Sequence, residues 1–318
     1  MKEYILVTGG CGYIGSCCVH ELIKKKYNVI VIDKKIRDFN SDVLYICGDI
    51  KNRKLLCDIF SRYSVSCVIH FASYIDVNES IKSPIKYYNN NILGTLSLLD
   101  CMVKKNVKKI IFSSSAAVYG MQEEIPISEN LKLQPINAYG NTKLCIERMI
   151  IDYNKAYGIN YVIFRYFNAA GADLKNNLGE NHKPETHIIP LIINSEQFKL
   201  FGDTYKTPDG SCIRDYVHIL DISGAHIKAI KYKNNDIFNI GSGVGYSNID
   251  IIDKIKRLYK KKKYNILVCD KRAGDPDKLI ADNKKMLNIF RYKLKYNIDD
   301  ILKHAIKYHC SGIKNNGF

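Results

Sequence analysis

Two side chains spaced like an acid–base pair stand out in this sequence, Tyr139 and Lys143. Because they are four residues apart, a helix would project both from one face. A phenol has a pKa of about 10, and lowering it by about 3 units takes about 4 kcal/mol of preferential stabilisation of the phenolate. A neighbouring ammonium group would contribute to that stabilisation. Tyr139 is therefore the candidate general base near neutral pH.

The spacing alone carries little weight, because chance predicts about three such matches in a chain this rich in Tyr and Lys. A second match, Tyr259 with Lys263, falls in a basic stretch without polar companions. The setting distinguishes Tyr139, which follows a proline-containing loop at the start of an apolar helical stretch. Ser115 ends a run of serines after a predicted strand. The pattern predicts that Ser115 and Tyr139 lie on the same side of a sheet.

A glycine-rich loop follows the first predicted strand, with Gly9, Gly12 and Gly15 in the spacing GxxGxxG. Glycines permit a tight turn and a close approach of backbone N–H groups to a pyrophosphate at a helix N-terminus. Asp33 ends the next predicted strand, 18 residues after Gly15. A carboxylate there accepts ribose hydroxyls and repels a 2′-phosphate. The loop therefore predicts NAD rather than NADP, with NADP left as an alternative because Lys34, Lys35 and Arg37 follow directly after Asp33. A bound nicotinamide would be a second cation near Tyr139.

The elements that must position these residues alternate between short apolar strands and helical stretches. The predicted strands are 4–8, 29–33, 44–48, 67–71, 109–113 and 161–166. Continuous apolar strands separated by helices are typical of a parallel sheet covered on both faces. We expect an α/β fold with a Rossmann-type doubly wound parallel sheet, whose ligands bind at the carboxyl ends of the strands.

The second half of the chain has a different texture. Residues 169–190 show no periodicity and are predicted to form a functional loop. Helices are predicted at 221–232, 249–259 and 299–309, and a strand at 237–240. We predict an NAD-binding domain at 1–170 and a smaller mixed substrate-binding domain at 171–318, with some segments returning to the first domain.

Composition limits the classes of partner. The 318 residues carry a net charge of +16 and 46% apolar residues, as in an ordinary globular protein. The cations are mostly scattered lysines, densest at 260–263, so a nucleic-acid partner is not expected. The 11 cysteines show no disulfide or metal-binding pattern, and no apolar stretch approaches the ~20 residues that span a bilayer. We expect a cytoplasmic protein with no metal and no membrane association.

With these motifs in place, the chain resembles the UDP-glucose/UDP-galactose 4-epimerases of the extended short-chain dehydrogenase/reductase superfamily. The resemblance runs to about residue 282 and rests on several stretches: TGGCGYIGS (8–16), HFAS (70–73), YYNNNILGT (87–95), FSSSAAVYG (112–120), AYGNTK (138–143), RYFNAAGAD (165–173), GENHKPETHIIP (179–190), TPDGSCIRDYVHILD (207–221) and RAGDP (272–276). The combination of RYFNAAGA, PETHIIP and DGSCIRDYVH is the most specific part.

The resemblance implies a mechanism of reversible oxidation at C4 of the sugar, through a 4-keto intermediate, with NAD retained. Tyr139 would take the proton of the 4-hydroxyl, Ser115 would hydrogen-bond the reacting oxygen, and Lys143 would hold the nicotinamide ribose. The residues implied to bind the cofactor are Gly9, Gly12, Tyr13, Ile14, Gly15, Asp33, Asp49, Ile50, Phe71, Ala72, Ser73, Asn90, Ser113 and Phe167. A homodimer formed through helices near 86–104 and 143–155 is implied as well.

The UDP-sugar partner is implied to contact a second set of residues: Asn168, His187, Ile188, Leu200, Phe201, Arg214, Tyr216, Arg272, Asp275 and Leu279. Arg214 and Arg272 would neutralise the diphosphate, and Asp275 would accept the uridine ribose hydroxyls. Arg214 alternatively pairs with the adjacent Asp215. Leu279 aligns with a position that is Tyr in strictly glucose/galactose-specific members, so UDP-GlcNAc and UDP-GalNAc are additional candidate substrates.

Competing functions have less support. A related NAD-dependent nucleotide-sugar dehydratase or decarboxylase is the nearest alternative, but a dehydratase needs an Asp-Glu pair after the strand-end serine, where this chain has Ala116 and Ala117. A catalytically silent NAD-binding regulator would not need Ser115, Tyr139 and Lys143 together.

Overall fold

The computed structural model describes residues 2–37, 40–260, 264–272 and 275–311. The chain divides into two compact units. The first unit comprises Met1–Tyr119, Leu133–Arg165 and Ser223–Phe238, and the second comprises Gly120–Lys132, Tyr166–Ile222 and Asn239–Phe318. Most of the basic run at 260–263, with Lys263 of the second tyrosine–lysine match, lies outside the described residues.

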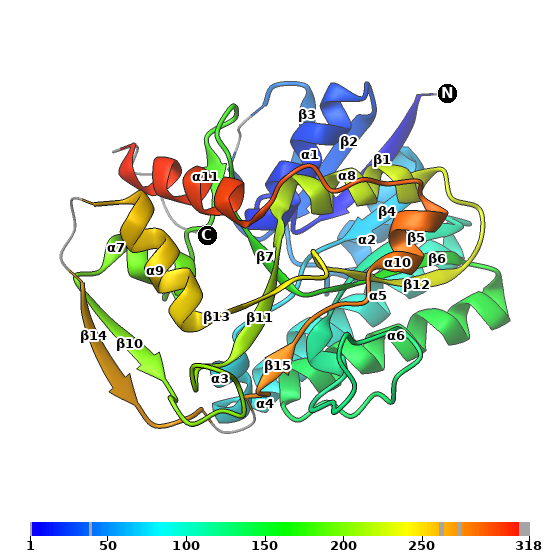
Figure 1. The fold of residues 1–318 in the computed structure, drawn as a ribbon. Helices are drawn as coiled ribbons and strands as arrows, with labels where there is room; N and C mark the ends of the chain where they lie inside the picture. The colour runs from blue at the N-terminus through cyan, green and yellow to red at the C-terminus, as the bar shows by residue number, and fades with distance from the viewer. Residues whose placement is uncertain (1, 38–39, 261–263, 273–274, 312–318) are drawn as a thin grey trace. The chain divides into compact units, whose positions relative to one another are not determined.

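Within the described residues, seven strands form the main sheet (Figure 1). In spatial order they are β12 (Asp236–Ile240), β6 (Asn160–Tyr166), β5 (Lys109–Ser115), β4 (Ser64–His70), β1 (Glu3–Thr8), β2 (Asn28–Asp33) and β3 (Val43–Cys47). The neighbouring pairs from β5 to β3 run parallel. The strand order reverses at β1, which lies between β4 and β2, and this confirms the predicted doubly wound sheet.

Helices cover both faces of this sheet. They are α1 (Tyr13–Lys24), α2 (Arg53–Arg62), α3 (Val77–Lys82), α4 (Pro84–Tyr87), the π-helical turn η1 (Tyr88–Ile92), α5 (Leu93–Lys104), the 3₁₀ turn η2 (Ala116–Val118), α6 (Ala138–Tyr157) and α8 (Ile219–Ile230). Leu6 packs with Leu56 of α2 and Leu98 of α5 in one apolar cluster. Because side chains alternate along a strand, the buried Ile5 and Val7 face the opposite side of the sheet from Leu6.

Local sequence signals set the limits of α6, the helix that carries Tyr139 and Lys143. The Asn137 side chain accepts a 2.8 Å hydrogen bond from the Gly140 amide, which caps the first turn. Gly158 ends the helix in the left-handed conformation, with φ of 68°. The helix therefore begins one residue before Tyr139, as the proline-containing loop predicts.

The second unit holds shorter elements: β7 (Asn168–Ala170), β8 (Ala172–Asp173), β9 (Leu178–Gly179), α7 (Ile188–Asn194), β10 (Gln197–Phe201), β11 (Ile213–His218), β13 (Gly245–Ser247), α9 (Asn248–Leu258), β14 (Asn265–Cys269), β15 (Lys278–Leu279), α10 (Lys284–Ile289) and α11 (Ile298–Cys310). Contrary to the expectation of an irregular segment, residues 169–190 contain short strands that pair with β11 and with each other. Two- and three-residue strands have too few residues to show a period of two, so the sequence does not reveal them.

Among the described residues, no helix is both long and apolar enough to cross a membrane. All eleven cysteines lie in described segments, and none of them forms a disulfide.

Candidate active site

The glycine loop lies at the carboxyl end of β1, at the point where the strand order reverses. Gly9 has φ of +70°, and a Cβ there would lie 2.6 Å from the Ala72 amide nitrogen. A Cβ on Gly15 would lie 2.2 Å from the Gly9 oxygen, so both positions require glycine. Gly12 caps α1 without a side chain, and no side-chain cap bonds the first amide groups of α1. These amides and the helix dipole suit a pyrophosphate.

Asp33 lies beside this loop. Its Oδ2 atom accepts a 3.1 Å hydrogen bond from the Cys11 amide, and burial raises the pKa of its carboxyl group, although hydrogen bonds from neighbouring amides oppose the shift. A carboxylate held at the second strand end, next to glycines that leave room for a phosphate, fits the adenosine ribose of NAD. The residues of this region therefore fit a dinucleotide.

Lys34 connects two of the predicted cofactor residues, and the sequence prediction did not include it. Its Nζ atom donates to Asn90 Oδ1 at 2.6 Å and lies 3.3 Å from Asp49 Oδ2. Burial acts to raise the pKa of Asp49. The hydrogen bond from the Lys51 amide and the charge of the Lys34 ammonium act more strongly in the opposite direction, so the pKa of Asp49 is lowered. A lysine directly after the strand-end Asp33 is the sequence signal that points to this bridge.

The other predicted cofactor residues have varied environments. The Ala72 amide donates to the Thr8 oxygen at 3.1 Å, which holds the end of β4 against the glycine loop. The Ser73 hydroxyl donates to the Tyr74 oxygen, and the Phe71 ring lies 5.0 Å from that of His226. Three further predicted cofactor residues are buried in the first unit: Tyr13, Ile50 and Ser113. Ile14 is partly exposed, and Phe167 is buried in the second unit.

The first turn of α6 approaches the end of β5 closely, and this approach depends on Gly140. A Cβ at this position would lie 2.6 Å from the Ala117 oxygen and 2.9 Å from Pro135 Cβ. Tyr139 is 9% exposed, and hydrogen bonding by the Ser115 hydroxyl acts on its phenol. The structure therefore brings together Tyr139 and Ser115, as predicted. It also assigns a role to Gly140 that the motif search missed, although the glycine stands in the sequence directly after the tyrosine.

Lys143 is oriented by the end of β5. Its Nζ atom donates a 2.7 Å hydrogen bond to the Ser113 oxygen and lies 5.7 Å from the Tyr139 ring centroid. Burial lowers the pKa of Lys143 to about 7, although the negative charge of Glu147 opposes this shift. Burial also raises the pKa of Tyr139, and only Ser115 opposes it. In the protein alone, desolvation therefore outweighs any stabilisation of the phenolate by Lys143. The predicted lowering of the Tyr139 pKa involves Lys143 together with the bound nicotinamide and stays a prediction.

A buried ion pair anchors α6 to the sheet. Arg165 of β6 donates to the Glu147 carboxylate through Nε at 3.0 Å and Nη2 at 2.7 Å, and through Nη1 to the Tyr119 hydroxyl at 2.9 Å. The Ser114 hydroxyl donates to Glu147 Oε1 at 2.5 Å. Glu147 lies one turn after Lys143, so this network fixes the face of the helix that carries the catalytic candidates.

In the second unit the structure brings together two predicted substrate residues, Arg214 and Asp275. Arg214 Nη2 donates to Asp275 Oδ1 at 2.8 Å, while its Nη1 atom donates to the main-chain oxygens of Ile213 and Pro276. The alternative local pairing with Asp215 is not observed between these described side chains. Asp215 instead accepts from the amides of Ser242 and Gly243. The ion pair with Asp275 neutralises part of the positive charge of Arg214. The hydrogen bonds from Nη1 to the two main-chain oxygens hold the guanidinium in place.

Arg272 lies with its guanidinium 4.0 Å from the centroid of the Phe201 ring. Tyr205, which the sequence prediction missed, has a buried hydroxyl without a hydrogen-bond partner among the described atoms. Burial raises the pKa of Tyr205 to about 12, with Asp275 acting in the same direction and Arg214 and Arg272 opposing it. The cations, the acid and this tyrosine therefore form one group whose chemistry suits a nucleoside diphosphate.

The remaining predicted substrate residues divide between core and surface. Leu200 is 4% exposed and packs in the apolar cluster of the second unit, whereas Phe201 points to the other face of β10. Leu200 is thus a core residue. Tyr216 is buried, and its hydroxyl has no hydrogen-bond partner among the described residues. Asn168 pairs in register with Tyr216 across β7 and β11, and Leu279 lies opposite Arg214 on β15. His187 occupies the position before α7 without a side-chain capping bond, half of its side chain is exposed, and Ile188 begins that helix.

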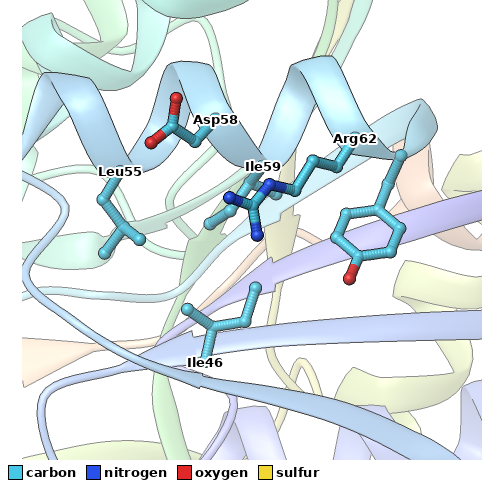
Figure 2. A pocket seen from close by; sticks show the side chains of 6 residues that line it. Ile46, Leu55, Asp58, Ile59 and Arg62 are labelled. Atoms are coloured by element: carbon cyan, nitrogen blue, oxygen red, sulfur yellow. The ribbon is translucent and has the colours of Figure 1, made fainter.

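A surface pocket lies elsewhere in the first unit, beside α2 (Figure 2). Leu55, Ile59 and Arg62 of α2 line it together with Ile46 of β3, and Asp58 and Tyr63 complete it. It contains none of the predicted site residues, and its single acid and single base offer no catalytic set. The candidate site is therefore defined by the strand ends and not by this pocket.

Comparison with known proteins agrees with this reading. Residues 5–241 match the NAD dependent epimerase/dehydratase family. A UDP-glucose 4-epimerase of Halalkalibacterium halodurans is 43% identical over 96% of this chain and 95% of its own length. A UDP-glucose 4-epimerase from Brucella ovis, solved with NAD, is 38% identical with a TM-score of 0.92, covering 97% of this chain and 98% of its own.

A third relative was solved with both kinds of ligand. It is a UDP-glucose 4-epimerase from Bifidobacterium longum in complex with NAD⁺ and UDP, 32% identical with a TM-score of 0.90, covering 97% of this chain and 98% of its own. The family match confirms the expected resemblance and the NAD dependence that goes with it. The glycine loop, the tyrosine–lysine helix and these full-length similarities together show that the chain belongs to the NAD dependent epimerase/dehydratase family.

Proposed function

We propose that this protein is a UDP-glucose 4-epimerase that interconverts UDP-galactose and UDP-glucose. The observation that carries the proposal is the group formed by Tyr139, Ser115 and Lys143 at the carboxyl edge of the same sheet that bears the glycine loop. The chemistry that NAD supplies when bound is reversible acceptance of hydride from C4 of the sugar. The full-length similarity to UDP-glucose 4-epimerases supports the choice of substrate.

Tyr139 takes the proton of the sugar 4-hydroxyl and returns it after the 4-keto sugar has presented its other face. Ser115 donates to or accepts from the same oxygen, consistent with its effect on the phenol. Lys143 holds the nicotinamide ribose while its Nζ is oriented by the Ser113 carbonyl. Burial raises the Tyr139 pKa, so the cationic nicotinamide has to supply most of the phenolate stabilisation.

The cofactor is held by the predicted glycine loop, by Asp33 at the ribose, and by Asp49 and Asn90, which Lys34 links. The UDP part of the substrate is held by Arg214, Arg272 and Asp275, with Tyr205 and Tyr216 as hydroxyl partners. Asn168, His187, Ile188, Phe201 and Leu279 complete the proposed contacts.

Incubation of the purified protein with UDP-galactose, without added NAD, tests the proposal. The expected product is UDP-glucose, separated from the substrate by anion-exchange chromatography, with the reverse reaction reaching the same equilibrium ratio. Accumulation of a 4-keto-6-deoxy sugar nucleotide would identify a dehydratase instead. If no product forms with or without NAD, the proposed activity is wrong.

We further propose that the protein is a cytoplasmic homodimer. The support is a run of exposed apolar side chains on α3 to α5, namely Ile81, Ile85, Leu93 and Leu96, with exposures of 53%, 71%, 47% and 40%. Apolar side chains gathered on adjacent helices favour burial against a second copy. Analytical ultracentrifugation of the wild-type protein should show a dimer. The double variant Ile85→Glu with Leu93→Glu should be a monomer. A monomeric wild-type protein at micromolar concentration would refute this.

A further inference from the structure

The segment between β9 and α7 gathers four side chains that bind metals well. Glu180, His182, Glu185 and His187 each offer one ligand atom, and these atoms all lie within 4.8 Å of one another. They come from eight consecutive residues in the pattern Glu-x-His-x-x-Glu-x-His. The folding of this segment onto itself therefore turns a short sequence into a convergent set of two imidazoles and two carboxylates.

The spacing of the ligand atoms agrees with that around a single ion. Zn²⁺ bonds to His nitrogen and carboxylate oxygen are about 2.0–2.2 Å long, so ligand atoms of a tetrahedral site lie about 3.3–3.6 Å apart. His182 Nδ1 lies 3.4 Å from Glu180 Oε1 and 3.8 Å from Glu185 Oε1. His187 Nδ1 lies 3.9 Å from Glu185 Oε1 and in close contact with Glu180 Oε1. Three of these four separations lie within a few tenths of an ångström of the tetrahedral spacing, and the contact between His187 and Glu180 would have to open when the ion binds.

The charges favour a divalent cation as well. Glu180 has a side chain only 6% exposed, and that of Glu185 is 16% exposed, so two carboxylates face each other with limited access to water. Two negative charges in such a place need two positive ones nearby. Two protonated imidazoles would meet that need only at the cost of repulsion between the histidines, whose ring centroids lie 5.4 Å apart. A divalent cation neutralises both carboxylates and leaves both imidazoles neutral.

The ligands are also held in place by their surroundings. The amides of Thr186 and His187 donate to Glu185 Oε1 at 2.8 and 2.9 Å, and the His182 amide donates to Glu185 Oε2 at 3.2 Å. Behind the cluster, a Cβ on Gly179 would lie 2.5 Å from Tyr308 Cδ1, so α11 packs directly on the strand that precedes Glu180. Ligands whose orientation is fixed before binding lose less entropy when they bind a metal.

We propose that Glu180, His182, Glu185 and His187 bind one Zn²⁺ ion in a four-coordinate structural site, in which His187 uses its Nδ1 atom and keeps its Nε2 atom for the proposed contact with the UDP-sugar. The ion cross-links the segment between β9 and α7 and so fixes the start of α7, where His187 and Ile188 lie. This departs from the expectation of no metal, which rested on cysteine-containing patterns and did not consider carboxylates with histidines. The site does not depend on the proposed epimerase activity, because metal binding is measured directly.

The test uses the full-length protein without a histidine tag, stripped of metal with a chelator and titrated with Zn²⁺ against a chromophoric indicator. We expect one tight equivalent per chain. His182→Gln and Glu185→Gln should each weaken binding by about a hundredfold or more, since outer-shell changes alone cost ten- to a hundredfold. His20→Gln, a histidine of α1 in the first unit, is the matched control and should keep the full equivalent.

Co²⁺ substitution separates this site from the exposed thiols of Cys47 and Cys310. A tetrahedral nitrogen and oxygen site gives intense visible d–d bands without the near-ultraviolet charge-transfer band of a cobalt thiolate. Zn²⁺ should also raise the thermal midpoint of the wild type and of His20→Gln, but not that of the two ligand variants. Equal Zn²⁺ affinity in wild type and His182→Gln, no tight binding at all, or a thiolate band would each overturn the proposal, leaving a cluster of histidine–carboxylate ion pairs.

Discussion

The Nζ atom of Lys143 donates a 2.7 Å hydrogen bond to the Ser113 carbonyl, although Tyr139 lies one turn earlier on the same helix. The ammonium is thus fixed by the end of β5 and not by the phenol that it is proposed to assist. Burial lowers the Lys143 pKa to about 7 and raises that of Tyr139. The two groups are therefore positioned before the cofactor binds, but their charges are set only when it does.

Tyr139→Phe should slow epimerisation strongly while leaving the fold intact, because it removes the proton acceptor and keeps the buried ring. We expect a loss of about 10²–10⁴-fold in kcat, the usual contribution of a general base. Tyr157→Phe, at the exposed end of the same helix, is the control and should retain full turnover. Unchanged turnover in Tyr139→Phe would mean that another group is the base.

The stability of the nucleotide-free protein should depend on pH through Lys143. The folded-state pKa of about 7 lies below the unfolded value of about 10.4, so between these values the unfolded chain binds more protons. The free energy of unfolding should therefore rise as the pH rises from about 7 to about 10, and this contribution is lost as the pH falls through about 7.

The comparison that isolates this effect is Lys143→Met, measured by urea denaturation across the same range. The wild-type value minus the variant value should increase with pH, whereas Lys155→Met, an exposed lysine on the same helix, should give a flat difference. A flat difference for Lys143→Met as well would show that Lys143 keeps an ordinary pKa in the folded protein.

Gly140→Ala should impair catalysis more than stability. The added Cβ would press on the Ala117 carbonyl and on Pro135, displacing the turn that carries Tyr139, at a cost of about 1–3 kcal/mol. Gly158→Ala at the other end of α6 meets nothing within 4 Å and should cost about 1 kcal/mol through its φ of 68° alone. Equal activity of the two variants at a temperature where both are folded would argue against close positioning by Gly140.

Breaking the buried pair of Glu147 and Arg165 should destabilise the first unit strongly. Glu147→Gln leaves Arg165 buried without its counter-charge, which should lower the free energy of unfolding by about 3–5 kcal/mol. The control, Glu79→Gln, removes a partly exposed pair with Lys86 and should lower it by at most about 1 kcal/mol. The free energies of unfolding from urea titrations give both values. Similar small losses would mean that the buried network contributes little.

Leu279→Tyr should narrow the sugar specificity. The wild type is expected to epimerise UDP-GlcNAc as well as UDP-glucose. In the variant, the tyrosine ring should reduce turnover of UDP-GlcNAc by tenfold or more, since a clash in a binding pocket typically costs about 1–3 kcal/mol. Turnover of UDP-glucose should change little. No detectable turnover of UDP-GlcNAc by the wild type would end this hypothesis.

Much of the first unit was determined by the sequence alone. Strands β1 to β6 are predicted to within three residues of their observed ends, because each is a continuous apolar run followed by a turn and a helix of clear period. The glycine loop, Asp33, Ser115, Tyr139 and Lys143 follow for the same reason, since each stands at a strand end or in a first helical turn. Such positions depend on contacts local in the chain.

Only the tertiary structure decided how distant residues pair and what their charges become. Arg214 pairs with Asp275, 61 residues away, and not with the adjacent Asp215, because the two side chains of neighbouring strand residues point to opposite faces. Leu200 proved to be core and Phe201 the partner of Arg272. The direction of the Tyr139 pKa shift depends on burial, which is set by all the packed elements together and so cannot be read from a local motif.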